Sequence, residues 1–226
     1  MSSEVTRVSS LLDDLKEEDG DKGRICHIGR LHGHDVILAQ SGVGKVNAAV
    51  QATRMILAYR PQVILNAGVA GGIDRGLQVM DIVVGQQTAY HDVDCGPDVL
   101  QGQIQDMPPF FEADSRLYGA AMSVTAESRI HGGLICTGDQ FVTDPQQLAR
   151  IKERYPDGLA VDMESAAFAQ VCHIFDIPFL SFRIISDTPG VEGHVDQYFS
   201  FWDEMADRSF GVTSAFLEAI CKLNIR

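Results

Sequence analysis

Apolar runs typical of buried strands alternate along this chain with segments of helical periodicity. The strand-like runs are residues 62–66, 81–84, 133–137 and 178–185. Helical patterns lie between them, most clearly at 44–59, which Pro61 stops, and at 145–154. Strands joined through helices usually form a largely buried sheet with the helices packed against it. The alternation therefore predicts an α/β fold.

The remaining segments carry weaker signals. Val5, Val8, Leu12 and Leu15 share one helical face, so we expect a helix that starts at Ser2 or Ser3 and ends in the charged stretch 16–22. Two short strands, 24–31 and 35–40, flank a hairpin turn at 32–34. Residues 91–112 predict a long loop, which in a compact domain is usually functional or packs on a partner. Further helices are expected at 115–129, 162–175 and 196–224.

Charge and length narrow the class of protein. Asp and Glu total 31 against 18 Lys and Arg, for a formal net charge of -13. Such a field repels a phosphate backbone, so no nucleic acid partner is expected. No apolar run approaches the roughly 20 residues that span a bilayer, so we expect no membrane segment. The 226 residues suit a single domain covering 1–226.

The five cysteines are scattered and form no C-x-x-C pair; they are Cys26, Cys95, Cys136, Cys172 and Cys221. This spacing argues against a disulfide framework or a zinc site. We interpret them as reduced thiols in small core positions, which fits a cytoplasmic protein. His91-Asp-Val-Asp94 offers only one imidazole, so no metal is expected there either.

Two glycine-rich segments are candidates for ligand contact. Ser41-Gly-Val-Gly-Lys45 fails as a phosphate loop, because Ala39 replaces its first glycine and Val46 replaces the hydroxyl that binds magnesium. Asn66–Gly72 follows a strand but lacks the dinucleotide spacing G-x-G-x-x-G. Its small residues let a ligand approach the backbone closely, although a tight crossover turn would need the same residues.

Acidic residues follow two apolar runs. Asp162 and Glu164 stand at a predicted strand-to-helix junction, where Glu164 would accept hydrogen bonds from a diol such as a ribose. Stabilisation of the helix N-terminus is the structural alternative. Arg183 and Asp187 are four residues apart and point to one side of an extended chain. They form either an ion pair or a site where a carboxyl holds or delivers a proton.

Five segments occur in the order and spacing of a known family: Ser41–Lys45, Asn66–Gly72, Gly138–Phe141, Val161–Glu164 and Arg183–Asp187. In them the chain resembles, from about residue 1 to 224, the 5′-methylthioadenosine/S-adenosylhomocysteine nucleosidases of the purine nucleoside phosphorylase superfamily. The resemblance implies a three-layer α/β/α sandwich and a homodimer without a cofactor. It also implies hydrolysis of the N-glycosidic bond of either nucleoside, releasing adenine and a 5′-thioribose.

The resemblance assigns roles by position. Asp187 matches the acid that serves purine N7, and Ser186 matches the residue that orients it. Arg183 and Glu4 match residues that hold and activate the attacking water, and Met163 and Glu164 match the ribose-binding pair. The resemblance implies that Phe141 stacks on the base and that the Val142 backbone contacts its edge. Val43 and Tyr198 would surround the 5′ substituent, and Ala70 and Gly71 are further substrate contacts. Part of the 91–112 loop would complete the neighbouring subunit's pocket.

The sequence departs from the family pattern in two places. Family members begin with an apolar strand leading into an A-M-x-x-E turn, and Met1–Glu4 matches only the end of that turn. We therefore expect the usual first strand to be missing. Val69 stands where relatives have a serine that helps to hold the water, so Glu4 and Arg183 would carry more of that task.

Other functions on the same scaffold stay open. A futalosine-type nucleoside hydrolase shares the fold. A purine nucleoside phosphorylase needs several cations for phosphate, and only Arg183 is evident here. A non-catalytic nucleoside-binding protein is the third alternative, because a fold alone does not define a function.

Overall fold

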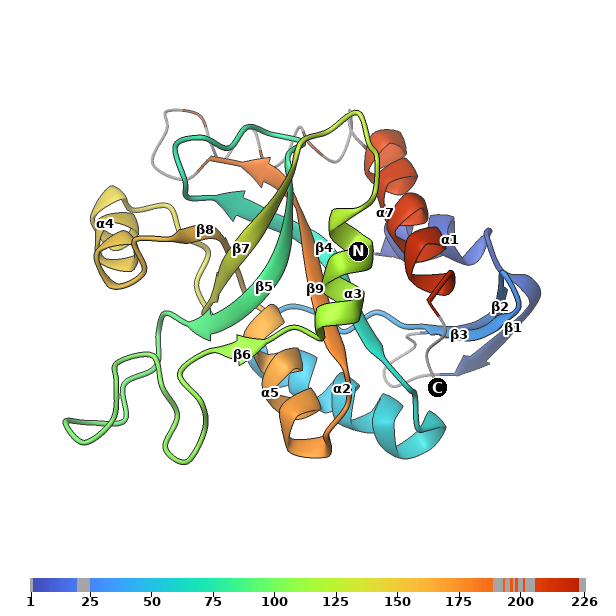
Figure 1. The fold of residues 1–226 in the computed structure, drawn as a ribbon, viewed down its shortest axis with the longest axis horizontal. Coiled ribbons are helices and arrows are strands. Elements are labelled where there is room, and N and C mark those ends of the chain that lie inside the picture. Colours follow the sequence, from blue (N-terminus) through green and yellow to red (C-terminus); the bar gives the residue numbers. More distant parts are fainter. Residues whose placement is uncertain are drawn as a thin grey trace.

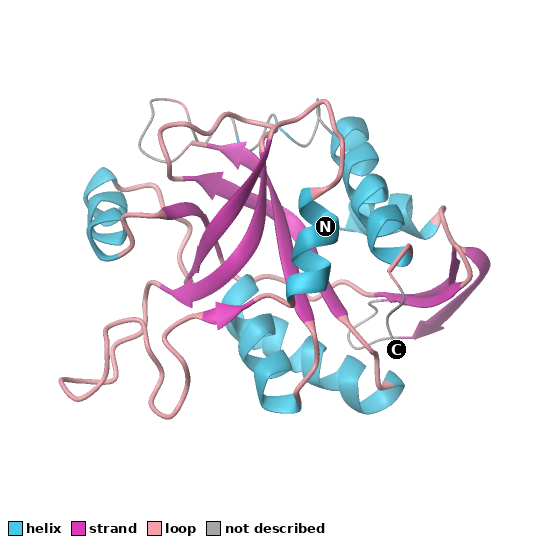
Figure 2. Cartoon of the chain, viewed as in Figure 1, coloured by secondary structure: helices cyan, strands magenta, loops and turns pink. Residues whose placement is uncertain are grey.

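The computed structural model describes residues 2–19, 25–188 and 206–223, together with Gly193, Asp196, Tyr198 and Phe201. The side chains of residues 2–4 and 206–209 lie outside that description. Strands and helices are mixed along the chain, so the predicted α/β class is confirmed (Figures 1 and 2). The strands are β1 (Asp13–Asp19), β2 (Ile25–Leu31), β3 (His34–Leu38), β4 (Ile64–Gly72), β5 (Ile82–Tyr90), β6 (Phe111–Glu112), β7 (Ile130–Thr137), β8 (Gly158–Asp162) and β9 (Phe179–Asp187). The helices are α1 (Ser2–Ser9), α2 (Lys45–Tyr59), α3 (Ser115–Met122), α4 (Pro145–Arg154), α5 (Ser165–Phe175) and α7 (Ala206–Cys221).

Five strands close into a barrel. The six-stranded sheet has the order β6-β5-β7-β8-β4-β9, and β5 also pairs with β9, so only β6 stands outside the ring. The pairs β5–β7, β7–β8 and β4–β9 are parallel, whereas β4–β8 and β5–β9 are antiparallel. Every residue of β9 is buried, as expected for a strand with neighbours on both edges and side chains on both faces.

The core has one cluster inside the ring and others between the ring and the helices. The buried side chains of one cluster come only from the ring strands and the β4–β5 connection: Ala70, Leu77, Val83, Ile135, Ala160 and Ile185. Helices α3 and α7 pack on one outer face, where the Phe216 ring stacks on Phe182 of β9 at a centroid distance of 4.6 Å. Helices α2 and α5 lie side by side on another face (Figure 1). The helices therefore pack on the outer faces of the ring and leave the ends of its strands uncovered.

The N-terminal part forms a separate three-stranded sheet of order β1-β2-β3. The predicted hairpin between β2 and β3 is confirmed, with His32 and Gly33 both at positive φ in its two-residue turn. The prediction that one helix runs on to Leu15 is wrong. The helix ends at Ser9, Asp14 adopts a φ of 53°, and β1 then pairs with β2, which gives its backbone groups hydrogen-bonding partners. Every residue of β1 is exposed.

The glycine-rich segment after residue 66 belongs to a strand and is no crossover turn. β4 continues to Gly72, pairing with β9 from Ile64 to Gly71 and with β8 at its last two residues. Glycine disfavours strands in general, but a side chain at Gly68 would meet the Arg183 guanidinium. The lack of a side chain here makes room for a buried charge.

Other boundaries differ by a few residues from the predictions. Helix α3 stops at Met122 instead of Arg129, and α5 begins at Ser165, so Asp162 and Glu164 precede it. The loop predicted at 91–112 is confirmed over 91–110, whereas residues 111–112 form β6. The Tyr155 hydroxyl donates to the Tyr90 carbonyl where the loop begins. Helix α7 covers 206–221 of the predicted 196–224, and most of the remainder lies outside the described residues. Among the described helices, none combines the length and the apolar character of a membrane span.

Candidate functional site

One pocket opens where β4, β8 and β9 end. Segments 40–43 and 140–142 form its other walls. The predicted site residues lie around it, with one exception: Asp187, Arg183, Glu164, Met163, Phe141, Val142, Ser186, Ala70, Gly71, Val43 and Tyr198. The exception is Glu4, whose side chain is outside the described part of the chain. Residues far apart in sequence thus share one cavity.

The acid at the end of β9 is buried and held. Asp187 is only 3% exposed, and the Ser186 hydroxyl donates to its Oδ1 at 2.8 Å. The Ser186 Oγ also lies 3.3 Å from the Ala70 carbonyl oxygen of the neighbouring strand. The pairing of β9 with β4 shifts register just before Asp187, so Ser186 and Asp187 both reach the pocket. The hydrogen bond from Ser186 therefore fixes the orientation of the Asp187 carboxyl group.

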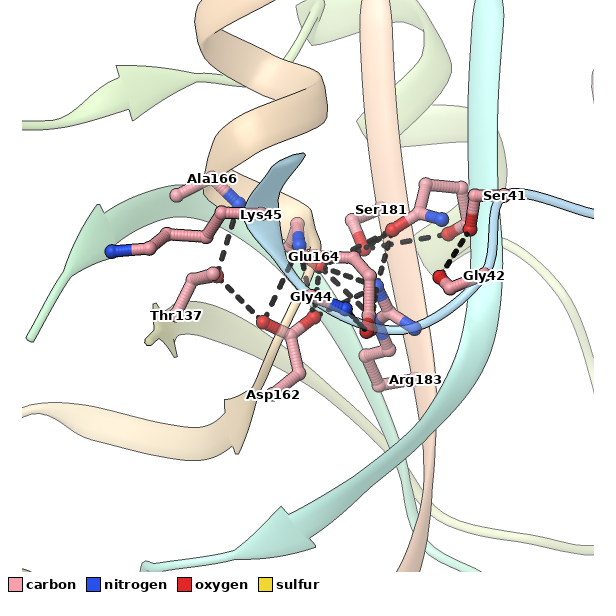
Figure 3. Close-up of polar contacts among 12 residues, drawn as sticks. Ser41, Gly42, Gly44, Lys45, Thr137, Asp162, Glu164, Ala166, Ser181 and Arg183 are labelled. Carbon is pink, nitrogen blue, oxygen red and sulfur yellow. Dashed lines mark hydrogen bonds and ion pairs between the residues drawn. The ribbon is translucent and has the colours of Figure 1, made fainter. Parts of the chain in front are cut away.

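A buried guanidinium, that of Arg183, lines the pocket, and Figure 3 shows it among its polar partners. The Arg183 side chain is 4% exposed, and its Nη2 lies 2.8 Å from the Asp162 carboxylate. The same guanidinium donates to the Ser165 hydroxyl and to the Asn66 amide oxygen. These partners come from β8, α5 and β4, so one cation joins three elements beside β9. Burial of a charge is tolerated because its donors are paired.

Glu164 is the carboxyl that faces the cavity beside this guanidinium. Its Oε1 accepts a 2.9 Å hydrogen bond from the Gly44 backbone N–H, and its Oε2 lies 3.8 Å from Arg183 Nη2. Burial raises the pKa of Glu164 above its usual range; Arg183 partly offsets this rise, and the Asp162 carboxylate adds to it. Glu164 is therefore fixed in place while one side of its carboxyl faces the pocket.

Aromatic and apolar groups line the other end of the pocket. The Phe141 ring is 47% exposed and meets the Tyr198 ring edge-on, with 5.1 Å between centroids. Val142 next to it is buried, whereas Val43 across the pocket is 68% exposed. An exposed ring above a cavity offers a flat face on which a heterocycle can stack.

Several residues that support the site were missed from the sequence. Asn66, Ser165 and Ser181 meet in the buried network around Arg183, and Ser165 Oγ lies 2.7 Å from Ser181 Oγ. Thr137 donates to Asp162 at 2.6 Å. One signal was available, because Ser181 is a polar residue near the start of a strand that is predicted to be buried. The described residues contain no group of three side chains suited to a metal ion.

Comparisons with known proteins agree with this geometry. The phosphorylase superfamily model matches residues 1–218. A 5′-methylthioadenosine/S-adenosylhomocysteine nucleosidase from Chromohalobacter salexigens is 37% identical over 97% of this chain and 94% of its own length. One from Bacillus thuringiensis is 37% identical over 94% of both chains.

Solved structures give the same result. The nucleosidase of Neisseria meningitidis in complex with methylthio-immucillin-A has a TM-score of 0.90 at 32% identity, covering 97% of this chain and 96% of its own. That of Colwellia psychrerythraea in complex with adenine has a TM-score of 0.87 at 34% identity, covering 97% and 92%. The pocket contains several acidic side chains, and these relatives match the chain in sequence and in structure along nearly its whole length. The chain therefore belongs to the 5′-methylthioadenosine/S-adenosylhomocysteine nucleosidase family of the phosphorylase superfamily.

Proposed function

We propose that this protein hydrolyses the N-glycosidic bond of 5′-methylthioadenosine and S-adenosylhomocysteine, releasing adenine and the corresponding 5′-thioribose. One observation carries the proposal: a single pocket joins the oriented carboxyl of Asp187, the fixed carboxylate of Glu164 and the exposed ring of Phe141. The names of the relatives and the adenine in one of the solved structures support the same substrate class.

In the proposed reaction the C1′–N9 bond breaks, and the bond electrons move into the purine. Asp187, oriented by Ser186, donates a proton to N7 and so stabilises the leaving adenine. Its other role is to accept a hydrogen bond from the 6-amino group, which suits an aspartate better than an asparagine. Phe141 stacks on the base, and the Val142 backbone reads its edge.

The sugar is held from the opposite side. Glu164 accepts hydrogen bonds from the ribose hydroxyls, next to Met163. A water molecule below C1′ forms the new C–O bond, with Arg183 holding it and Glu4 taking its proton. Val69 lies among the lining residues and offers no hydrogen bond, so the water depends on those two groups. Ala70 and Gly71 let the nucleoside approach the backbone, and Val43 and Tyr198 surround the 5′ substituent.

The charge of the pocket favours water over phosphate as the nucleophile. Its described lining contains three carboxyl groups, those of Asp162, Glu164 and Asp187, and one guanidinium, so the net charge is negative even when Asp187 carries its proton. Arg183 is already paired with Asp162 at 2.8 Å. A phosphate dianion would meet net negative charge there, so a phosphorylase is disfavoured by electrostatics.

The finer features of the fold are part of the proposal. The chain is a single nucleosidase domain, 1–226, with the three-layer α/β/α arrangement of the family. Supporting this, α2 with α5 and α3 with α7 pack on different outer faces of the ring. Buried thiols at Cys26, Cys136 and Cys172 are consistent with a reducing cytoplasm, although Cys95 is exposed and is no core residue.

A homodimer is supported by an apolar stripe on α2. Val46, Val50 and Leu57 lie on one helical face and are 73%, 52% and 67% exposed. Leu100 in the 91–110 loop is 64% exposed. Exposed apolar side chains gathered on one face mark protein interfaces. The second copy covers this stripe, and its 91–112 loop completes the pocket beside Val43.

The first test of the function is release of free adenine from methylthioadenosine in phosphate-free buffer. We expect adenine and methylthioribose in equal amounts, measured by chromatography, with no increase in rate when phosphate is added. A phosphorylase would require phosphate, a futalosine hydrolase would leave this substrate intact, and a binding protein would release nothing.

Substitution of the acid tests the mechanism. We expect Asp187→Asn to lower kcat at least about 100-fold, because an amide cannot transfer the proton. The KM should change much less than kcat, since the side chain keeps its size and its amide oxygen can still accept a hydrogen bond from the 6-amino group. Asp35→Asn, at an exposed position of β3, serves as the control with unchanged kcat. Near-normal adenine release by Asp187→Asn would refute the acid assignment.

The raised pKa of Glu164 predicts a pH effect on stability. The unfolded chain loses this proton near the ordinary pKa of about 4.3, while the folded protein keeps it to higher pH. Between those values the folded state binds more protons, so this group lowers stability as pH rises. The free energy of unfolding of Glu164→Gln minus that of wild type should therefore increase from about pH 4 and level off above the folded-state pKa.

The measurement is urea denaturation at steps of pH. Glu218→Gln is the control with the opposite sign, because the Lys222 side chain lowers the pKa of Glu218. For that variant the same difference should decrease with rising pH. A flat difference for Glu164→Gln would contradict the assigned environment of Glu164.

The proposed dimer predicts a defined mass in solution. Sedimentation velocity should give twice the chain mass at micromolar concentration, and Val50→Glu should shift it to the monomer with loss of activity. Leu15→Glu, at an exposed position on β1, should stay dimeric. A monomeric wild-type protein with full activity would overturn the dimer proposal.

A further inference from the structure

Two polar residues singled out in the sequence have no role in the proposed reaction. Lys45 belongs to the glycine-rich segment that failed as a phosphate loop, and Asp92 belongs to the segment that failed as a metal site. The structure brings them together: Lys45 Nζ lies 2.8 Å from both carboxylate oxygens of Asp92. They meet although 47 residues separate them in the chain.

A third residue turns this ion pair into a closed bridge. Asp139 accepts a 2.7 Å hydrogen bond from the Lys45 backbone N–H, and its own backbone N–H donates to Asp92 Oδ2 at 2.8 Å. Each residue is thus bonded to the other two, and we call the set Lys45, Asp92 and Asp139 the loop bridge. It joins the start of α2, the end of β5 and the loop after β7.

The loop bridge is partly protected from water. The Lys45 and Asp92 side chains are 23% and 14% exposed, and the ammonium lies 5.3 Å from the centre of the Tyr90 ring. A bidentate, partly buried ion pair with an added backbone donor holds its geometry better than an exposed pair. Removal of the Asp92 carboxylate leaves both the Lys45 ammonium and the Asp139 backbone N–H without their acceptor, and removal of the Lys45 ammonium leaves the Asp92 carboxylate without its cation.

Two residues of the bridge lie directly beside walls of the pocket. Lys45 follows the wall 40–43, which carries Val43, and the backbone N–H of Gly44 between them donates to Glu164. Asp139 precedes the wall 140–142, which carries Phe141 and Val142. None of the three bridge residues lines the pocket, and the Lys45 side chain points away from Glu164 and Arg183 (Figure 3).

A side chain at Gly44 would come within 2.9 Å of the Asp139 carboxylate, so the two walls are in close contact behind the pocket. In the proposed function a nucleoside lies between these walls, with its base against Phe141 and its 5′ group against Val43. The strand end that carries Arg183 and Asp187 contains no bridge residue.

We propose that Lys45, Asp92 and Asp139 are positioning residues, which hold the base-stacking wall and the 5′ wall of the pocket at the separation that a 5′-thionucleoside requires. The inference rests on the proposed function. Loosening the bridge should weaken binding of the nucleoside while leaving proton transfer by Asp187 largely intact, because small displacements of binding groups reduce productive binding strongly.

The test compares Lys45→Met with Lys45→Arg. In the first variant the ammonium is lost and the aliphatic stem is kept; in the second the cation is kept. We expect Lys45→Met to raise the KM for methylthioadenosine about tenfold or more and to lower kcat less than about threefold. Lys45→Arg should restore most of the KM. Asp92→Asn should act like Lys45→Met, and the double variant Lys45→Met/Asp92→Asn should lose no more kcat/KM than the worse single variant.

Lys152→Met is the matched control for a merely structural effect. Lys152 also joins loops through an ion pair, 3.5 Å from Asp74, and donates to the carbonyls of Pro156 and Gly158. Neither Lys152 nor Asp74 lines the pocket. This variant should lower the melting temperature without changing the KM.

The proposal would be overturned if Lys45→Met kept its KM within twofold of wild type, or if Lys45→Arg failed to restore it. It would also be overturned if the KM rose equally in Lys152→Met at the same loss of melting temperature. If the wild-type protein releases no adenine, the proposed function is wrong, and the role of the loop bridge is then tested by binding alone. Calorimetry measures the dissociation constant for adenine. The loop bridge predicts weaker binding in Lys45→Met and unchanged binding in Lys152→Met.

Discussion

The site depends on one buried cation. Arg183 occupies the inside of the strand ring, and its guanidinium is nearly shielded from water. A buried charge of this kind is stable only when its donors are satisfied. Asp162 supplies the opposite charge, and Ser165 and Asn66 supply neutral acceptors. Because these partners lie on different elements, the ends of three strands and the start of α5 are held in one arrangement around the pocket.

This arrangement places the acids of the pocket in different environments. Asp162 is bonded to Arg183, Thr137 and Ser165 and is fully engaged in the scaffold. Glu164, two residues later, keeps its carboxyl at the edge of the cavity, held by a backbone N–H. Asp187 is buried at the end of another strand beside a serine. Similar carboxyls thus have different environments, and such differences are what the proposed reaction requires of groups that bind the sugar, support the scaffold and transfer a proton.

Much of the architecture was predictable because its signals are local. The apolar runs of β5, β7 and β9 and the long loop at 91–110 were recognised from patterns of a few residues each. The failures have physical reasons as well. The residues after Ser9 have the apolar spacing of a helix, but the structure ends the helix at Ser9 and pairs β1 with β2 instead. The glycines of β4 disfavour a strand locally, and the pairing with β9 and the nearby guanidinium override that preference.

By itself, the sequence predicted which residues would carry chemistry and which local elements would hold them, because apolar periodicity and acid–base side chains are properties of short segments. Only the tertiary structure decided that the ring closes, that Asp162 serves Arg183 instead of a substrate, and that Lys45 meets Asp92 and Asp139. These contacts join residues tens of positions apart. Their partners are chosen by burial and by the need to satisfy charges in a medium without water, and no local pattern encodes that choice.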